Sequence, residues 1–93
     1  MTVSQGDPVV QSFRERIETL DERILTAVNE RLSLVAELHR YKEQHGLARV
    51  DREREEQLLR QLTDANHGPL SPAGVVELFE FVLALVKREA RLG

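Results

Sequence analysis

The sequence contains no cysteine, which excludes disulfide bonds, thiolate metal sites and a cysteine nucleophile. Aromatic residues make up only 4% of the chain, so an aliphatic core is expected. Long apolar runs are also lacking: the opening MTVSQGDPVV is too polar for a secretory signal peptide, and no later segment is apolar enough to span a membrane. These absences predict a cytoplasmic protein with no membrane partner.

The charged residues show no excess of basic side chains. The 93 residues carry a formal net charge of −3, which gives no broad basic field for phosphates and disfavours nucleic-acid binding. A hydrophobic content of 41% together with 31% charged residues is typical of a folded, helix-rich chain. A chain of this length forms one small domain.

Proline and glycine are few, and their positions divide the chain into helices. Asp7 and Pro8 form a typical helix start, and neither proline nor glycine recurs until Gly46, where a helix would end. Further helices are expected over 51–65 and from Ser71-Pro72 onward. The sequence therefore predicts an all-α fold with one long and two shorter helices over 8–93, after a flexible N-terminal tail of residues 1–7.

The first of these helices is long for so small a protein. Its apolar residues recur three or four positions apart, as on one face of a helix: Ile17, Leu20, Ile24, Val28, Val35 and Leu38. About 35 residues at about 1.5 Å each form a rod of about 50 Å, which two short helices cannot cover. The sequence therefore predicts an intertwined homodimer whose long helices share a core. An extended two-chain coiled coil without a pocket is the alternative.

Charged residues interrupt the apolar faces of the first two helices. Steps of three or four along the first helix reach Arg31 and Lys42, which are eleven residues apart and point in nearly the same direction. Steps back along the second helix reach Glu55 and then Asp51. Burying an unpaired cation is costly unless an anion meets it. The pattern indicates a polar cavity, with salt bridges between helices or snorkelling side chains as the structural alternative.

The segments that carry these charges resemble the all-helical chorismate mutases. The similarity runs without gaps over residues 13–62, through FRERIETLDERIL, NER, the lysine of RYK, and DREREEQLL. In the last of these, Asp51, Arg54 and Glu55 fit the D-x-x-R-E spacing of that family. The third helix matches more loosely through ELFEFVL, at residues 77–83. Residues 8–93 are thus interpreted as a chorismate mutase-like helical domain.

The resemblance implies an isomerase that converts chorismate to prephenate in phenylalanine and tyrosine biosynthesis. In this Claisen rearrangement a C–O bond breaks as a C–C bond forms, so no nucleophile, metal or cofactor is required. Isochorismate-pyruvate lyases and aminodeoxychorismate mutases are similar in sequence and remain alternatives. A non-catalytic helical dimer that acts as a regulatory subunit is a further alternative from another class.

The resemblance also assigns roles to the charged residues. Arg31 would clamp a substrate carboxylate, Lys42 would donate to the ether oxygen, and Glu55 would accept from the ring hydroxyl. These three are the implied catalytic residues. Asp51 would both cap the second helix and line the ring side of the substrate. Arg54 would support the substrate from one side.

A second carboxylate clamp is implied at Arg14. This residue lies about 100° around the first helix from Arg31, so it cannot easily serve the same chain's pocket. In the family the corresponding arginine enters from the partner subunit, which agrees with the homodimer predicted from helix length. A solvated surface charge is the structural alternative for Arg14.

The third helix departs from the family pattern. The family carries a small polar residue there and, four residues later, a glutamine or glutamate that contacts the ether oxygen. The corresponding substrate-binding positions are Val86 and Ala90, whose side chains cannot form hydrogen bonds. Either Lys42 acts alone, or Lys87, Arg88 or Glu89 substitutes after a register shift, or something else completes the site.

The ending REARLG, at residues 88–93, is similar to the C-terminus of the short actinobacterial chorismate mutases. Those enzymes are weak alone and are activated by docking onto DAHP synthase, so the resemblance implies the same partner for this end of the chain.

The three histidines, His39, His45 and His67, show no metal-ligand spacing and are each expected to be solvated.

Overall fold

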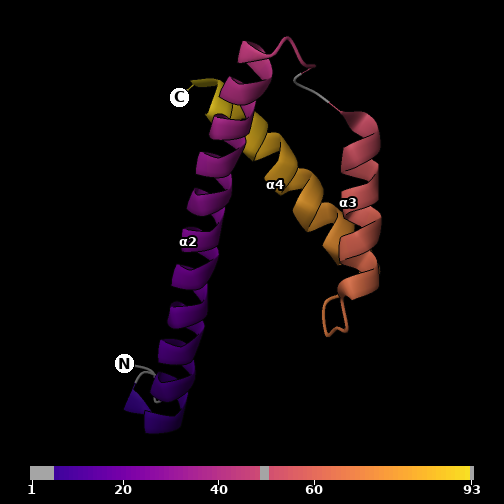
Figure 1. The fold of residues 1–93 in the computed structure, drawn as a ribbon. Helices are drawn as coiled ribbons and strands as arrows, with labels where there is room; N and C mark the ends of the chain where they lie inside the picture. Colours follow the sequence, from indigo (N-terminus) through magenta and orange to yellow (C-terminus); the bar gives the residue numbers. More distant parts are fainter. Residues whose placement is uncertain (1–5, 49–50, 93) are drawn as a thin grey trace. The chain divides into compact units, whose positions relative to one another are not determined.

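The computed structural model describes residues 6–48 and 51–92, apart from the side chains of the last two. It contains three helices, α2 (Pro8–Gln44), α3 (Arg52–Ala65) and α4 (Pro72–Leu92), shown in Figure 1. No strand occurs within the described ranges. The all-α prediction with one long and two shorter helices is therefore confirmed. Most of the predicted tail, residues 1–5, lies outside the described residues.

Both ends of α2 follow from its sequence. At the start, the Asp7 carboxylate accepts hydrogen bonds from the backbone N–H groups of Val9 (2.8 Å) and Val10 (3.3 Å). At the end, Gly46 adopts a φ of +66°, which glycine tolerates without a steric penalty. Leu47 N–H donates to the Lys42 carbonyl at 2.8 Å, the hydrogen bond expected of a Schellman motif. This motif closes the last turn of α2 around the backbone of Lys42.

The two shorter helices begin with side-chain caps. Asp51 has an extended backbone conformation, and its carboxylate accepts from the Arg54 backbone N–H at 3.1 Å. Ser71 Oγ accepts from the Gly74 N–H at 3.0 Å, with Pro72 as the first residue of α4. The expected helix starts at 51 and 71–72 are thus confirmed, with Asp51 and Ser71 as caps rather than helical residues.

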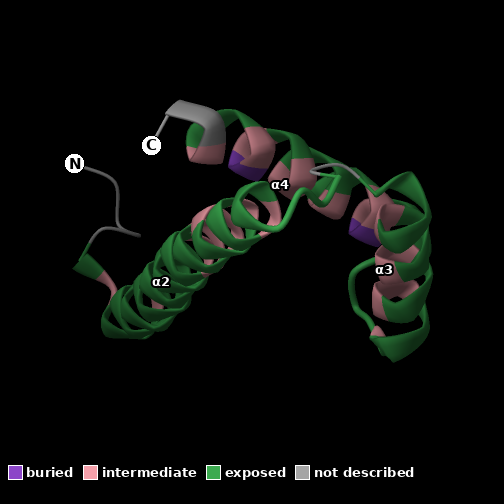
Figure 2. Ribbon diagram, turned by 45° about the horizontal axis from the view of Figure 1, so that its top comes forward, coloured by how far each residue is buried: buried purple, intermediate pink, exposed green. Residues whose placement is uncertain are grey.

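The chain divides into two compact units, Met1–Glu30 and Arg31–Gly93. Within the second unit α3 packs against α4. The buried residues of the described chain, Val75 and Val86, both lie on α4 (Figure 2). The second unit therefore has a small aliphatic core centred on its last helix.

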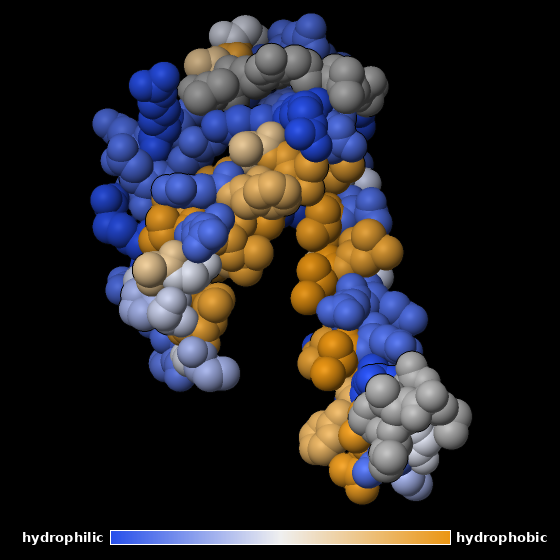
Figure 3. All heavy atoms as spheres, turned by 180° about the vertical axis from the view of Figure 1, so that it is seen from behind, coloured by the Kyte–Doolittle hydropathy of each residue, from blue (hydrophilic) through white to orange (hydrophobic). Residues whose placement is uncertain are grey.

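The first unit leaves its apolar residues uncovered. Six large apolar side chains are between 52% and 63% exposed there: Val9, Phe13, Ile17, Leu20, Ile24 and Leu25. Figure 3 shows apolar side chains gathered along one side of α2. Of the stripe predicted to face inward, Ile17, Leu20 and Ile24 are therefore exposed in this unit and Val28 is half-buried, because the described part of the unit is essentially one helix.

Candidate functional site

A cavity of about 220 Å³ lies within the second unit and receives side chains from all three helices. From here on it is called the charged cavity. The lining residues are Arg31, Val35, Leu38, His39, Lys42, Asp51, Arg54, Glu55, Leu83, Val86 and Lys87. Its volume lies just below the range of about 300–1,000 Å³ usual for ligand pockets, which suits a small ligand.

Most of the residues predicted from the sequence line this cavity. They are Arg31, Lys42, Asp51, Arg54, Glu55 and Val86. Arg14 belongs to the first unit and is exposed. Ala90 is half-buried on α4 and lies outside the lining residues. The structure thus brings together the predicted residues of α2 and α3, with one of the two predicted on α4.

The two cations of α2 line the same cavity, as their spacing predicts. Arg31 and Lys42 are both half-buried. Their separation of eleven residues is close to three helical turns, so both side chains leave the helix on one side. Val35 lies on the same side between them and contributes apolar surface to the cavity wall.

Asp51 has a structural role that can be separated from its position in the cavity. Its carboxylate oxygen caps α3, while the residue also lines the charged cavity. A capping carboxylate also interacts favourably with the positive end of the helix dipole. The prediction that Asp51 caps the second helix is confirmed.

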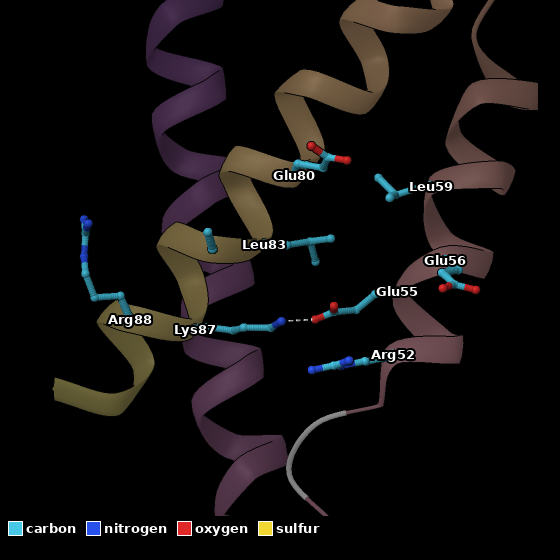
Figure 4. A pocket seen from close by; sticks show the side chains of 9 residues that line it. Arg52, Glu55, Glu56, Leu59, Glu80, Leu83, Lys87 and Arg88 are labelled. Atoms are coloured by element: carbon cyan, nitrogen blue, oxygen red, sulfur yellow. Dashed lines mark ion pairs between the residues drawn. The ribbon is translucent and has the colours of Figure 1, made fainter.

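Glu55 forms an ion pair with Lys87, and the pair joins α3 to α4. Figure 4 shows the two side chains extending toward each other from the facing helices. Next to Lys87, Val86 is only 2% exposed and presents an apolar side chain to the cavity. The contribution of α4 to the cavity is therefore part apolar and part cationic.

The charges around the cavity do not cancel. Its cations are Arg31, Lys42, Arg54 and Lys87, and its carboxylates are Asp51 and Glu55. These leave a formal excess of two positive charges around the cavity, in a chain whose net charge is −3. A small ligand with two negative charges would balance this excess.

A second, more open cavity of about 650 Å³ lies on the α3–α4 surface. It shares Glu55, Leu83 and Lys87 with the charged cavity, as Figure 4 shows for the residues around the ion pair. Its charged residues balance, with three cations and three carboxylates: Arg52, Glu55, Glu56, Glu80, Lys87 and Arg88. It is therefore a weaker candidate than the charged cavity for binding an anion.

One histidine lies in a different environment from the one predicted. His39 was expected to be solvated, but it is half-buried and lines the charged cavity. The signal was its position, four residues after Val35 and three before Lys42, which is also helical spacing. His45 and His67 are exposed, as expected, and the His45 ring stacks on Tyr41 with centroids 4.0 Å apart.

Three α4 residues were predicted as possible replacements for the polar groups missing at Val86 and Ala90, and the structure distinguishes among them. Lys87 lines the charged cavity, whereas Arg88 and Glu89 do not.

In the part of the chain that is described, no group of three or more His, Cys, Asp or Glu residues is arranged to hold a metal ion. None of the described helices combines the length and apolarity needed to cross a membrane.

Comparison with known proteins identifies the family. The sequence profile of chorismate mutase type II matches residues 13–91. The chain belongs to the chorismate mutase type II family. This membership confirms the resemblance drawn from residues 13–62, extends it through α4, and makes the chain an enzyme of the isomerase class.

Solved chorismate mutase structures from Thermus thermophilus share the fold. The form II structure has 29% sequence identity and a TM-score of 0.84, covering 88% of this chain and 93% of the other. The form I structure has 31% identity and a TM-score of 0.81, covering 83% and 96% respectively. No curated protein sequence matches the chain significantly.

Replacing Asp51 separates its capping role from its charge. Asp51→Ala removes the cap of α3 and is expected to lower the free energy of unfolding by about 1 kcal/mol. Asp51→Asn keeps a capping oxygen without the negative charge, so it is expected to retain most of the stability. Urea unfolding at one protein concentration measures both variants. Equal stability of the wild type and Asp51→Ala would contradict the capping role.

Proposed function

We propose that the charged cavity binds chorismate and catalyses its rearrangement to prephenate. The observation that carries this proposal is the excess of two positive charges around a cavity of small-molecule size. Chorismate is a small dicarboxylate, so its charge complements that excess. Family membership supports the same reaction.

The reaction needs positioning and electrostatics more than reactive side chains. It is intramolecular and pericyclic, so the enzyme must hold the compact conformer in which the two reacting carbons approach each other. Negative charge develops on the ether oxygen as the C–O bond breaks. Fixed donors aimed at that oxygen stabilise the transition state more than the ground state.

The cations of α2 supply the first part of this mechanism. Arg31 binds one substrate carboxylate with two parallel hydrogen bonds, for which a planar guanidinium is suited and an ammonium is not. Lys42 donates to the ether oxygen and to a carboxylate, because an ammonium has three donors. Their common position on α2 supports both roles, since it directs both groups into one cavity.

The residues of α3 act on the ring side of the substrate. Glu55 accepts a hydrogen bond from the ring hydroxyl, and Asp51 lines the ring while capping the helix. Arg54 supports the substrate from one side, and its backbone N–H is the donor that Asp51 caps. These assignments use polar groups that a rigid helix start holds in place.

The α4 side of the cavity is poor in donors toward the ether oxygen. Val86 lines the cavity but is apolar and buried, and Ala90, the family's second polar position, lies outside the lining and has no polar side-chain atom. The loss of one donor directed at developing charge lowers a rate by about 100-fold to 1,000-fold. The isolated protein is therefore proposed to be a slow mutase.

The active form is proposed to be a homodimer of the helical domain, residues 8–93. The exposed apolar side chains of the first unit would be covered by the same stripe of a second copy. Arg14 lies among them in sequence and would enter the partner's cavity as the second carboxylate clamp. The extended coiled coil without a pocket receives no support, because the second unit holds a cavity.

The C-terminal end is proposed to dock onto DAHP synthase in the cytoplasm. Residue 93 and the side chains of residues 91 and 92 lie outside the described part, so this proposal rests on the REARLG sequence alone. Docking would activate the enzyme if the synthase bound the transition-state complex more tightly than the free enzyme.

A substrate comparison tests the proposed reaction. Purified protein is expected to convert chorismate to prephenate and to leave isochorismate and aminodeoxychorismate unchanged. Arg31→Ala is expected to abolish detectable turnover with the fold intact, whereas Arg40→Ala, an exposed arginine outside the cavity, should keep it. Pyruvate release from isochorismate without prephenate formation would contradict the proposal.

Subunit mixing tests whether Arg14 acts in the partner's site. Arg14→Ala and Arg31→Ala are each expected to be inactive dimers. After subunit exchange, random pairing leaves roughly a quarter of all sites with both arginines, so activity should recover to about that fraction. As a control, Arg14→Ala mixed with the double variant should recover nothing. Confirmed hybrids without activity, or a folded monomer in dilute solution, would contradict the shared site.

Truncation tests the proposed partner. Chorismate turnover by the full-length chain is expected to rise when the organism's own DAHP synthase is added. A chain lacking residues 91–93 should keep the slow basal rate and lose the activation. If the isolated protein is fast and does not respond to the synthase, two proposals are contradicted: the slow turnover attributed to the missing α4 donor, and the docking role of the REARLG segment.

A further inference from the structure

The contribution of α4 to the charged cavity consists of Leu83, Val86 and Lys87. Leu83 and Val86 offer only apolar surface, so Lys87 provides the polar side chain of this helix within the described lining. Its ammonium has three N–H donors and no acceptor. Any polar contact between a ligand and an α4 side chain in this cavity would therefore use Lys87.

The ion pair with Glu55 directs the Lys87 ammonium without using all of its donors. Lys87 contacts Glu55 Oε1, which leaves further N–H groups of the ammonium for other acceptors. The carboxylate likewise keeps its second oxygen for another donor. The side chains of Lys87 and Glu55 are 42% and 27% exposed, so solvent screens the pair and it adds little to stability. The pair is better suited to orienting the two groups than to holding the helices together.

Lys87 also decides the charge balance of the cavity. With it, the lining residues carry a formal excess of two positive charges, and without it the excess is one. Two charges match a dicarboxylate, whereas one charge matches a monoanion. The cation from α4 therefore favours doubly charged ligands.

We propose that Lys87 is a substrate-binding residue that donates to an anionic oxygen of the dicarboxylate, while Glu55 holds its ammonium toward the cavity. This inference rests on the proposed function, because it assigns a further contact to the same site. Lys87 acts mainly on binding, since the charge that it meets is present in the substrate as well as in the transition state.

The neighbouring Arg88 provides a matched control on the same helix. It carries the same charge, but its side chain is 68% exposed, and its Nε lies 3.7 Å from Oε2 of Glu89 on the same helix. Figure 4 shows that Arg88 does not extend toward Glu55, whereas Lys87 does. Removing either charge changes the net charge of the protein equally, so a difference between the two variants reports on the cavity.

The experiment compares Lys87→Met, Lys87→Arg and Arg88→Met in chorismate turnover. Lys87→Met is expected to lower kcat/KM by about 10- to 100-fold, mostly through a higher KM, because a hydrogen bond to a charged group is lost from both substrate and transition state. Lys87→Arg keeps the charge and should recover part of this loss. Assayed without DAHP synthase, Arg88→Met should match the wild type. Thermal melting of all variants confirms that each is folded.

Binding of prephenate, the dicarboxylate product, measured by calorimetry, provides a second readout that does not need turnover. Lys87→Met is expected to bind prephenate about 10-fold or more weakly than Arg88→Met does. Equal prephenate affinities and equal KM values for these two variants would overturn the role of Lys87. A Lys87→Met variant that melts at a lower temperature than the wild type but keeps its kcat/KM would also overturn it. A wild-type protein that does not convert chorismate would contradict the proposed function instead, and the binding comparison would still decide the role of Lys87.

Discussion

Four cations and only two carboxylates line one small cavity of the second unit, so its own carboxylates do not balance the charge of its cations. The carboxylates are Asp51, which caps α3, and Glu55 of α3, whose pairing with Lys87 brings the α4 cation close to an anion. In the proposed function, the formal excess of two positive charges is balanced by a dicarboxylate ligand. An excess of cations around a cavity favours the binding of an anion, because the negative charges of the anion reduce the repulsion among the cations.

Helix termini determine where these charges lie. The Schellman motif closes α2 around the backbone of Lys42, and the Asp51 cap starts α3 four residues before Glu55. Each terminus satisfies backbone groups that would otherwise lack partners. The same hydrogen bonds that end one helix and begin the next therefore position cavity residues on both sides of the connection.

The first unit presents a different physical problem. Its apolar stripe is as regular as that of a buried helix, yet the large side chains on it are more than half exposed. Exposed apolar surface on this scale favours association. Because α2 continues from this unit into the second unit, where Arg31 and Lys42 line the charged cavity, association through the stripe would involve the same helix that forms one wall of that cavity.

The sequence by itself determined the three helices, their caps and the common direction of Arg31 and Lys42, because these depend on spacing and on hydrogen bonds between residues close together in the chain. Asp51, Arg54 and Glu55 followed from one short motif. Only the tertiary structure decided which face of α4 meets the cavity, because nearly every face of that helix carries apolar residues and periodicity cannot choose among them. It also brought His39 into the lining and paired Lys87 with Glu55, contacts that depend on how separate helices pack.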